Sequence, residues 1–170
     1  MHDGIGKWFA HHDAVLDDLA QWLWNHPELA LQEYQTAEQV GNFMQAQGFE
    51  VDRHTIGPGG ERPNCIVARW GSGKPAIGFI GDMDAFPETR NEPGPYEARK
   101  PGAGHACGHH LVTASGMAAA CALKHVMASE RISGSVFFFG CPAEEAVGGK
   151  YFMALEGLFD DVDVFYQWHP

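Results

Sequence analysis

The sequence has little positive charge and few cysteines. Its 170 residues include 11 Lys and Arg against 22 Asp and Glu, which gives a formal net charge of −11. Non-specific binding to nucleic acid needs a basic surface, as does docking on an anionic membrane, so the charge balance argues against both. Four scattered cysteines are too few for a disulfide framework. Divalent cations and neutral polar ligands are the partners that this composition favours.

Long apolar runs are also missing. No uninterrupted apolar stretch approaches the roughly 18–20 residues of a membrane span. Residues 1–6 lack the basic and apolar segments of a signal peptide. We therefore expect a cytoplasmic protein that binds neither membrane nor nucleic acid. The sequence does have 10 histidines, a high number for its length, within an ordinary globular composition of 45% hydrophobic residues.

The hydrophobic spacing changes along the chain in a way that is typical of α/β proteins. Helical spacing or small-residue patterns predict helices over 5–25, 33–47, 110–128 and 150–157. Alternating or continuous apolar runs predict strands over 49–55, 64–70, 76–81, 135–140 and 162–168. Proline, glycine and charge indicate a loop over 86–104. This order predicts a three-layer α/β sandwich with a mostly parallel central sheet.

The sequence stops at His169 and Pro170, directly after a strand that looks buried. A sheet edge left there would need a further helix or strand to cover it. We therefore expect the chain to be a fragment or truncated product of a longer α/β domain.

Polar side chains that suit metal chemistry follow several of the predicted strands. Ligands of open α/β sheets bind outside the carboxyl ends of the strands. The residues at such ends are Asp82, Asp84, His105, Cys107, His109, His110, Glu144, Glu145 and His169. Thiolate and imidazole are good ligands for zinc and other first-row divalent metals. The alternative for the histidine-rich loop is a buried thiol beside surface histidines.

The acidic residues each have a functional and a plain interpretation. Glu144 and Glu145 are either a solvated pair or a metal ligand next to a free base that takes a proton from water. The two-residue spacing of Asp82 and Asp84 places both on the same side of the strand. Asp84 would then orient a ligand imidazole. The alternative interpretation is that Asp84 is an ordinary turn residue.

Five motifs in this order resemble the amidohydrolase branch of the aminoacylase/carboxypeptidase G-type metallopeptidase superfamily. They are His26-Pro27-Glu28-Leu29, Asp82-Met83-Asp84-Ala85, His105-Ala106-Cys107-Gly108-His109, Pro142-Ala143-Glu144-Glu145 and His169. The stretches at 140–145, 149–150, 157–163 and 168–170 most resemble the B-subunit group of aminobenzoyl-glutamate hydrolases. The likeness extends over nearly the whole chain, from about residue 22 to residue 170.

The resemblance implies a role for each site residue. The implied metal ligands are Cys107, His109, Glu145 and His169, with Glu144 as general base and Asp84 as supporting carboxylate. It also implies two divalent metal ions per complete site, zinc or manganese. The implied reaction is hydrolysis of the amide bond between an acyl or aroyl group and an amino acid, with a small N-acyl amino acid as substrate.

The sequence departs from the family pattern at two positions and in length. His110 stands where the branch usually has Asp, and Gly81 stands where Ala is common. Family members continue into a lid-and-dimerisation domain, supply a further histidine ligand and are dimeric. Residues 1–170 are thus expected to be the N-terminal portion of a metal-dependent amidohydrolase catalytic domain, which binds metal weakly and hydrolyses little by itself.

Two other interpretations stay open. One is a non-catalytic, family-like subunit or remnant that acts in assembly or metal binding, and the other is a structural α/β domain with an incidental cluster. The intact pair of Glu144 and Glu145 favours the enzyme.

Overall fold

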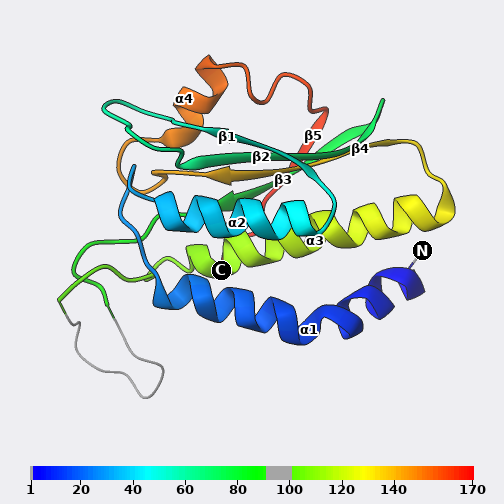
Figure 1. Ribbon diagram of the computed structural model, residues 1–170, viewed down its shortest axis with the longest axis horizontal. Coiled ribbons are helices and arrows are strands. Elements are labelled where there is room, and N and C mark those ends of the chain that lie inside the picture. The colour runs from blue at the N-terminus through cyan, green and yellow to red at the C-terminus, as the bar shows by residue number, and fades with distance from the viewer. Residues whose placement is uncertain (1, 91–100) are drawn as a thin grey trace.

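Helices and strands follow one another in the order that the hydrophobic spacing predicts (Figure 1). The computed structural model describes residues 2–90 and 101–170, so part of the loop expected over 86–104 lies outside the described residues. The helices are α1 (His2–Asn25), α2 (Tyr34–Ala46), α3 (His109–Glu130) and α4 (Gly149–Leu155). The strands are β1 (Glu50–His54), β2 (Cys65–Ser72), β3 (Ala76–Asp82), β4 (Gly134–Cys141) and β5 (Val164–Tyr166).

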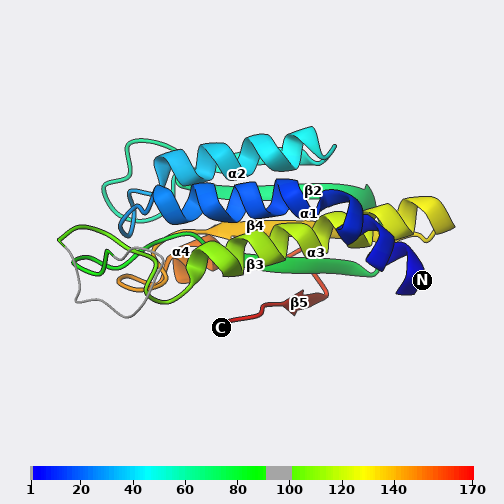
Figure 2. The same cartoon turned by 90° about the horizontal axis from the view of Figure 1, so that it is seen from below.

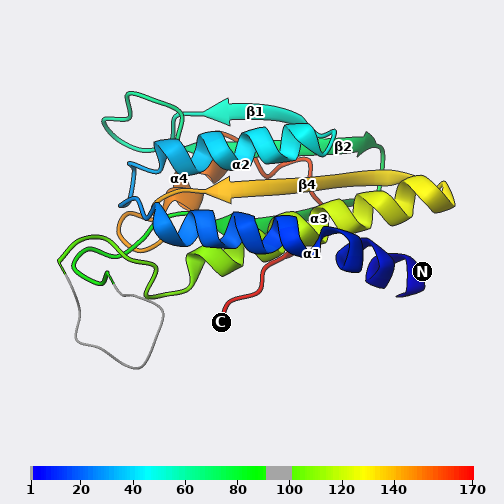
Figure 3. The ribbon, with the colours of Figure 1, turned by 60° about the horizontal axis from the view of Figure 1, so that its bottom comes forward.

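The strands form one sheet in the order β1-β2-β4-β3-β5. β2 pairs antiparallel with both β1 and β4, whereas β3 pairs parallel with both β4 and β5. It follows that β1, β3, β4 and β5 run in one direction and β2 runs against them, as Figure 3 shows for β1, β2 and β4. The predicted mostly parallel central sheet is confirmed.

The sheet lies between two layers of helices (Figures 1 and 2). α1, α2 and α3 lie on one face, and α4 lies on the other. Buried apolar side chains fill both contacts, with Leu23, Met117 and Phe138 on the side of the three helices and Phe139 and Met153 on the side of α4. The predicted three-layer α/β sandwich is therefore confirmed.

The two apolar strands in the second half of the chain differ in burial. Every residue of β4, in the middle of the sheet, is buried. The three residues of β5 are exposed, because this strand lies at the edge of the sheet and pairs only with β3. The expectation that the last strand is buried is therefore wrong.

α3 lies close to β3 because small residues occupy the contact. A Cβ atom on Gly116 would lie 3.0 Å from the carbonyl oxygen of Ile80, and one on Gly81 would lie 2.8 Å from the Cα atom of Thr113. Side chains larger than hydrogen do not fit such a contact, so helix and strand meet backbone to backbone. This approach explains the glycine at position 81 and fixes the start of α3 near the end of β3.

α3 is also long and apolar enough to cross a membrane, judged by length and composition alone. Helices in a protein core meet the same criterion, and α3 is mostly buried, with contacts to β3, β4 and α1. The sequence has no uninterrupted apolar run of that length, and the helix that meets the criterion is one that the fold mostly buries.

Gly116→Val should lower the free energy of unfolding by about 1–3 kcal/mol, because an overpacked contact forces the backbones apart. Urea unfolding followed by circular dichroism measures the loss. Ser115→Val changes an exposed position of the same helix, and this control should cost less than about 1 kcal/mol. Equal losses in the two variants would contradict the close packing of α3 on β3.

Candidate metal centre

Two adjacent parallel strands deliver the acidic residues of the site. Asp82 lies opposite Cys141 in the register of β3 and β4, so both strands end at the same level. The N–H of Met83 donates to the carbonyl oxygen of Cys141 at 2.9 Å. The following residues leave the sheet together, and the N–H of Glu145 donates to Oδ2 of Asp84 at 2.9 Å.

His109 is the first residue of α3 and is buried beneath these two loops. Gly108 precedes it with a φ of 84°, in the left-handed region, and turns the chain into the helix. The Nδ1 atom of His109 lies 2.9 Å from the carbonyl oxygen of Asp84 and 3.2 Å from its Oδ1. Two oxygens next to Nδ1 require a proton on that nitrogen, so Nε2 is the nitrogen available to a metal.

Asp84 and His109 shift each other's ionisation. Burial by itself raises the pKa of Asp84, but the hydrogen bonds from His109 and the backbone of Glu145 bring it below its ordinary value. Burial by itself lowers the pKa of His109, but Asp84 raises it above its ordinary value. The carboxylate therefore stays charged and holds the imidazole in one orientation.

The Nε2 atom of His109 faces the two glutamates that follow β4. It lies 3.5 Å from Oε1 of Glu145 and 3.8 Å from Oε2 of Glu144. Both Nε2 of His109 and Oε1 of Glu145 are buried, and neither has a hydrogen-bond partner among the described residues. Buried polar atoms are rarely left unpaired. Two such atoms that face each other fit a cation between them.

Cys107 and His169 lie beside the same imidazole. Sγ of Cys107 is 3.4 Å from Nε2 of His169, and the rings of His109 and His169 have centroids 5.5 Å apart. Ligand atoms of Cys107, His109 and His169 lie within 4.8 Å of one another, as do those of His109, Glu144 and Glu145. The predicted ligands and the predicted base thus lie in two groups that share His109, and their individual roles stay predictions.

The chemistry of the Cys107 thiol also suits a metal ligand. Burial first, and then the carboxylates of Glu145, Glu144 and Asp84, raise its pKa to about 11. The thiol therefore keeps its proton at neutral pH in the metal-free protein, and a bound divalent cation would displace that proton. A donor set of thiol, imidazole and carboxylate suits zinc and other first-row divalent metals.

Asp82 belongs to a different network from Asp84. β3 ends at Asp82, so the two-residue period of a strand does not continue to Asp84. The buried carboxylate of Asp82 pairs with Nζ of Lys150 and accepts a hydrogen bond from Nε2 of Gln167. The expectation that the strand places both aspartates on one side is thus wrong for Asp84, which lies beyond the end of β3. Asp84 holds the imidazole, whereas Asp82 ties α4 and the segment after β5 to the sheet.

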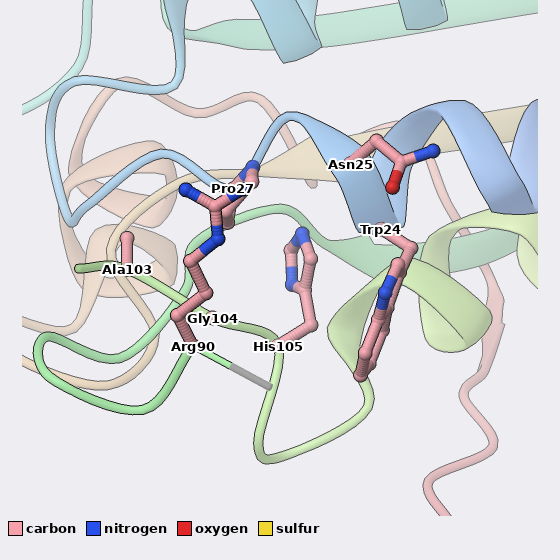
Figure 4. Close-up of a pocket in the computed structure, with 7 residues that line it drawn as sticks. All are labelled: Trp24, Asn25, Pro27, Arg90, Ala103, Gly104 and His105. Carbon is pink, nitrogen blue, oxygen red and sulfur yellow. The ribbon is translucent and has the colours of Figure 1, made fainter. Parts of the chain in front are cut away.

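Two histidines of the predicted cluster face α1 instead of the site. Nε2 of His105 lies 3.1 Å from the carbonyl oxygen of Leu23, and the ring borders a cavity of about 30 Å³ that Arg90 also lines (Figure 4). The ring of His110 contacts Trp24 edge-on, with centroids 4.9 Å apart. Burial lowers the pKa of His105 to about 4 and also lowers that of His110. Both rings are therefore uncharged packing groups at neutral pH.

The first of the five motifs lies in the loop between α1 and α2 and fastens that loop to the site. The carboxylate of Glu28 accepts hydrogen bonds from the N–H groups of Gln35 at 3.1 Å and Thr36 at 2.8 Å, in the first turn of α2. Its carbonyl oxygen accepts the N–H of Ala85 at 2.8 Å. The motif therefore caps a helix and anchors the residue that follows Asp84.

Glu33 is part of the site's surroundings in a way that the sequence pattern does not indicate. The pattern only places it at the start of the second helix. In the structure it is fully buried, and its Oε1 accepts the N–H groups of Leu31 at 3.1 Å and Ala143 at 2.7 Å. Acidic residues at the start of a helix are commonly exposed. The sequence around Glu33 therefore does not show that this one is buried.

Comparison with known proteins agrees with this geometry. Residues 78–170 match the family model described as Peptidase family M20/M25/M40. The chain is 38% identical to a subunit of the p-aminobenzoyl-glutamate hydrolase of Escherichia coli over 156 residues, which are 90% of this chain and 32% of that protein. It is 35% identical to hippurate hydrolase of Campylobacter jejuni over 146 residues, which are 85% of this chain and 36% of that protein.

A solved structure has the same arrangement of helices and strands. A dinuclear metal-binding peptidase of the M20 family from Bacillus subtilis aligns with a TM-score of 0.71 at 27% identity, over 89% of this chain and 41% of that chain. The chain thus spans about a third of the length of the two curated relatives. The matched residues make up more than half of the chain and include most of β3, all of α3 and β4, and every candidate ligand. On these grounds the chain belongs to the peptidase family M20/M25/M40.

Proposed function

We propose that these residues form part of the active site of a metal-dependent amidohydrolase, which hydrolyses the amide bond between an acyl or aroyl group and an amino acid. The observation that carries the proposal is the buried Nε2 of His109, 3.5 Å from a carboxylate oxygen of Glu145, both without a hydrogen-bond partner in the described part of the chain. Cys107, His169 and Glu144 border the same space.

Cys107, His109, Glu145 and His169 would hold the metal. We propose two divalent ions, zinc or manganese, because the Bacillus subtilis relative is described as dinuclear. When bound, such ions polarise the scissile carbonyl and lower the pKa of a water molecule. Asp84 supports this site by keeping a proton on Nδ1 of His109, which leaves Nε2 as the ligand atom.

We propose Glu144 as the general base. Its side chain is 39% exposed against 14% for Glu145, so it is accessible to water and substrate while its neighbour points inward. Its Oε2 lies 3.8 Å from Nε2 of His109, at the border of the candidate metal site. Glu144 would take one proton from the attacking water and pass the same proton to the leaving amine, so the base is regenerated in each cycle.

The proposed substrate class rests on the two curated relatives. One is named for p-aminobenzoyl-glutamate and the other for hippurate. Each of these compounds joins a benzoyl-type group to an amino acid through an amide, so we propose a small N-acyl or N-aroyl amino acid as substrate. The Escherichia coli relative is named as a subunit, and the proposal therefore extends to an assembly of more than one chain.

Cobalt(II) should bind the chain with a thiolate-to-cobalt charge-transfer absorption, because Cys107 supplies a sulfur ligand. Cys107→Ser should abolish that band, and Glu145→Gln should weaken the affinity at least about tenfold. Titration followed by ultraviolet and visible absorption measures both. His125→Gln replaces an exposed histidine late in α3 and is the matched control. A wild-type spectrum without the sulfur band would contradict the proposed ligand set.

Glu144→Gln should lower the rate of hydrolysis of p-aminobenzoyl-glutamate by about 10²- to 10⁴-fold, the usual contribution of a general base. Its cobalt affinity should stay near that of the wild type. The neighbouring Glu145→Gln should lower both the rate of hydrolysis and the cobalt affinity. Amine release by the metal-loaded chain, expected to be slow, measures the rate. Cobalt binding without any hydrolysis would favour a non-catalytic role in metal binding or assembly, and an unchanged rate in Glu144→Gln would exclude this residue as the base.

A further inference from the structure

We infer that Glu33 is a positioning residue for the metal centre, because one oxygen of its carboxyl group holds the backbone turn that carries Glu144 and Glu145. The inference rests on the proposed function, since it assigns Glu33 to the same site. Glu33 itself does not belong to either group of candidate ligands.

The contact joins two parts of the chain that are far apart in the sequence. Glu33 directly precedes α2, and its side chain has no exposed surface. Its Oε1 accepts the N–H of Ala143, two residues after the end of β4, at 2.7 Å. The same oxygen accepts the N–H of Leu31 at 3.1 Å. A single buried oxygen thus connects the loop before α2 to the turn that carries the two glutamates.

Both residues that donate to Glu33 have an unfavourable backbone conformation. Ala143 has a φ of 54° and Leu31 a φ of 67°. Residues with a side chain rarely adopt this left-handed region, and they do so only where their surroundings hold them in place. For Ala143, the buried hydrogen bond to Glu33 is such a support.

The backbone of Ala143 makes the hydrogen bonds that hold the following turn together. Its carbonyl oxygen accepts the N–H groups of Gly148 at 2.9 Å and Gly149 at 3.2 Å, which closes the turn. Its N–H is held by Glu33, and the N–H of Glu145 is held by Asp84. Loss of the Glu33 contact would free one end of this turn and let the glutamate side chains move away from His109.

The protonation of Glu33 agrees with this role. Burial raises its pKa to about 8, although the hydrogen bonds to the backbone lower it. A neutral carboxyl group at neutral pH still offers its carbonyl oxygen to two N–H donors. It also adds no further negative charge near Asp84, whose own charge is needed to orient His109.

Two variants of Glu33 test whether its acceptor oxygen is what holds the turn. Glu33→Gln keeps an oxygen at the position of Oε1, whereas Glu33→Met has a similar length and no such acceptor. Glu38→Met is the matched control, because it makes the same substitution at an exposed carboxylate within α2. Glu33→Asp, which draws the carboxyl group back by one methylene, replaces Glu33→Met if that variant does not fold.

Two measurements test the effect of losing the Glu33 contact, and the first of them needs no metal. Amide hydrogen exchange at Ala143, followed by nuclear magnetic resonance, should become at least about tenfold faster in Glu33→Met and stay near wild type in Glu33→Gln. The dissociation constant for cobalt(II) should rise about 10- to 100-fold in Glu33→Met, as for other residues that support ligands. Glu38→Met should keep both the exchange rate at Ala143 and the cobalt affinity of the wild type.

The outcomes distinguish this inference from the proposed function. A folded Glu33→Met with wild-type exchange at Ala143 and wild-type cobalt affinity would overturn the inference and leave the proposed metal site intact. Equal losses in Glu33→Gln and Glu33→Met would also overturn it, because the acceptor oxygen would then not be the cause. Failure of the wild-type chain to bind cobalt would overturn the metal site, and the role of Glu33 with it.

Discussion

The parallel pairing of β3 with β4 is the constraint on which the rest of the site depends. It aligns Asp82 with Cys141, so the two chain segments that follow leave the sheet next to each other. One segment then provides Asp84 and the other Glu145, joined by a hydrogen bond of 2.9 Å. The close contact of α3 with β3 at Gly116 places the start of that helix, and hence the imidazole, beneath both segments. The sheet thus brings Asp84 and Glu145 together at one edge.

The electrostatics of the site favour a cation. Asp84, Glu144 and Glu145 lie around one buried imidazole, and Lys150, the nearby amine, is paired with Asp82 instead. Burial and then the neighbouring carboxylates raise the pKa of the Cys107 thiol, so in the metal-free protein the sulfur carries a proton in place of a metal. Acidic residues gathered at partly buried positions repel one another unless a positive charge lies among them. A bound divalent ion would satisfy the charges and the unpaired atoms together.

Much of the fold and of the candidate site could be predicted from the sequence, since periodicity identifies each element and strand ends identify the polar residues between them. The contacts that connect distant segments could not be predicted. Glu33 reaches Ala143 across 110 positions and carries no local signal. His105 and His110 are next to the ligand residues in sequence but face α1, because the chain turns into α3 between them. The exposure of β5 depends on its place at the edge, which a strand pattern does not encode.

The central claim is that a sulfur and an imidazole from this chain bind the same ion. X-ray absorption at the zinc edge of the zinc-loaded chain tests it most directly, because sulfur and the lighter ligands scatter differently. We expect one sulfur at about 2.3 Å and the remaining ligands at about 2.0–2.2 Å, with the sulfur signal lost in Cys107→Ser. A first coordination sphere of nitrogen and oxygen alone would contradict it.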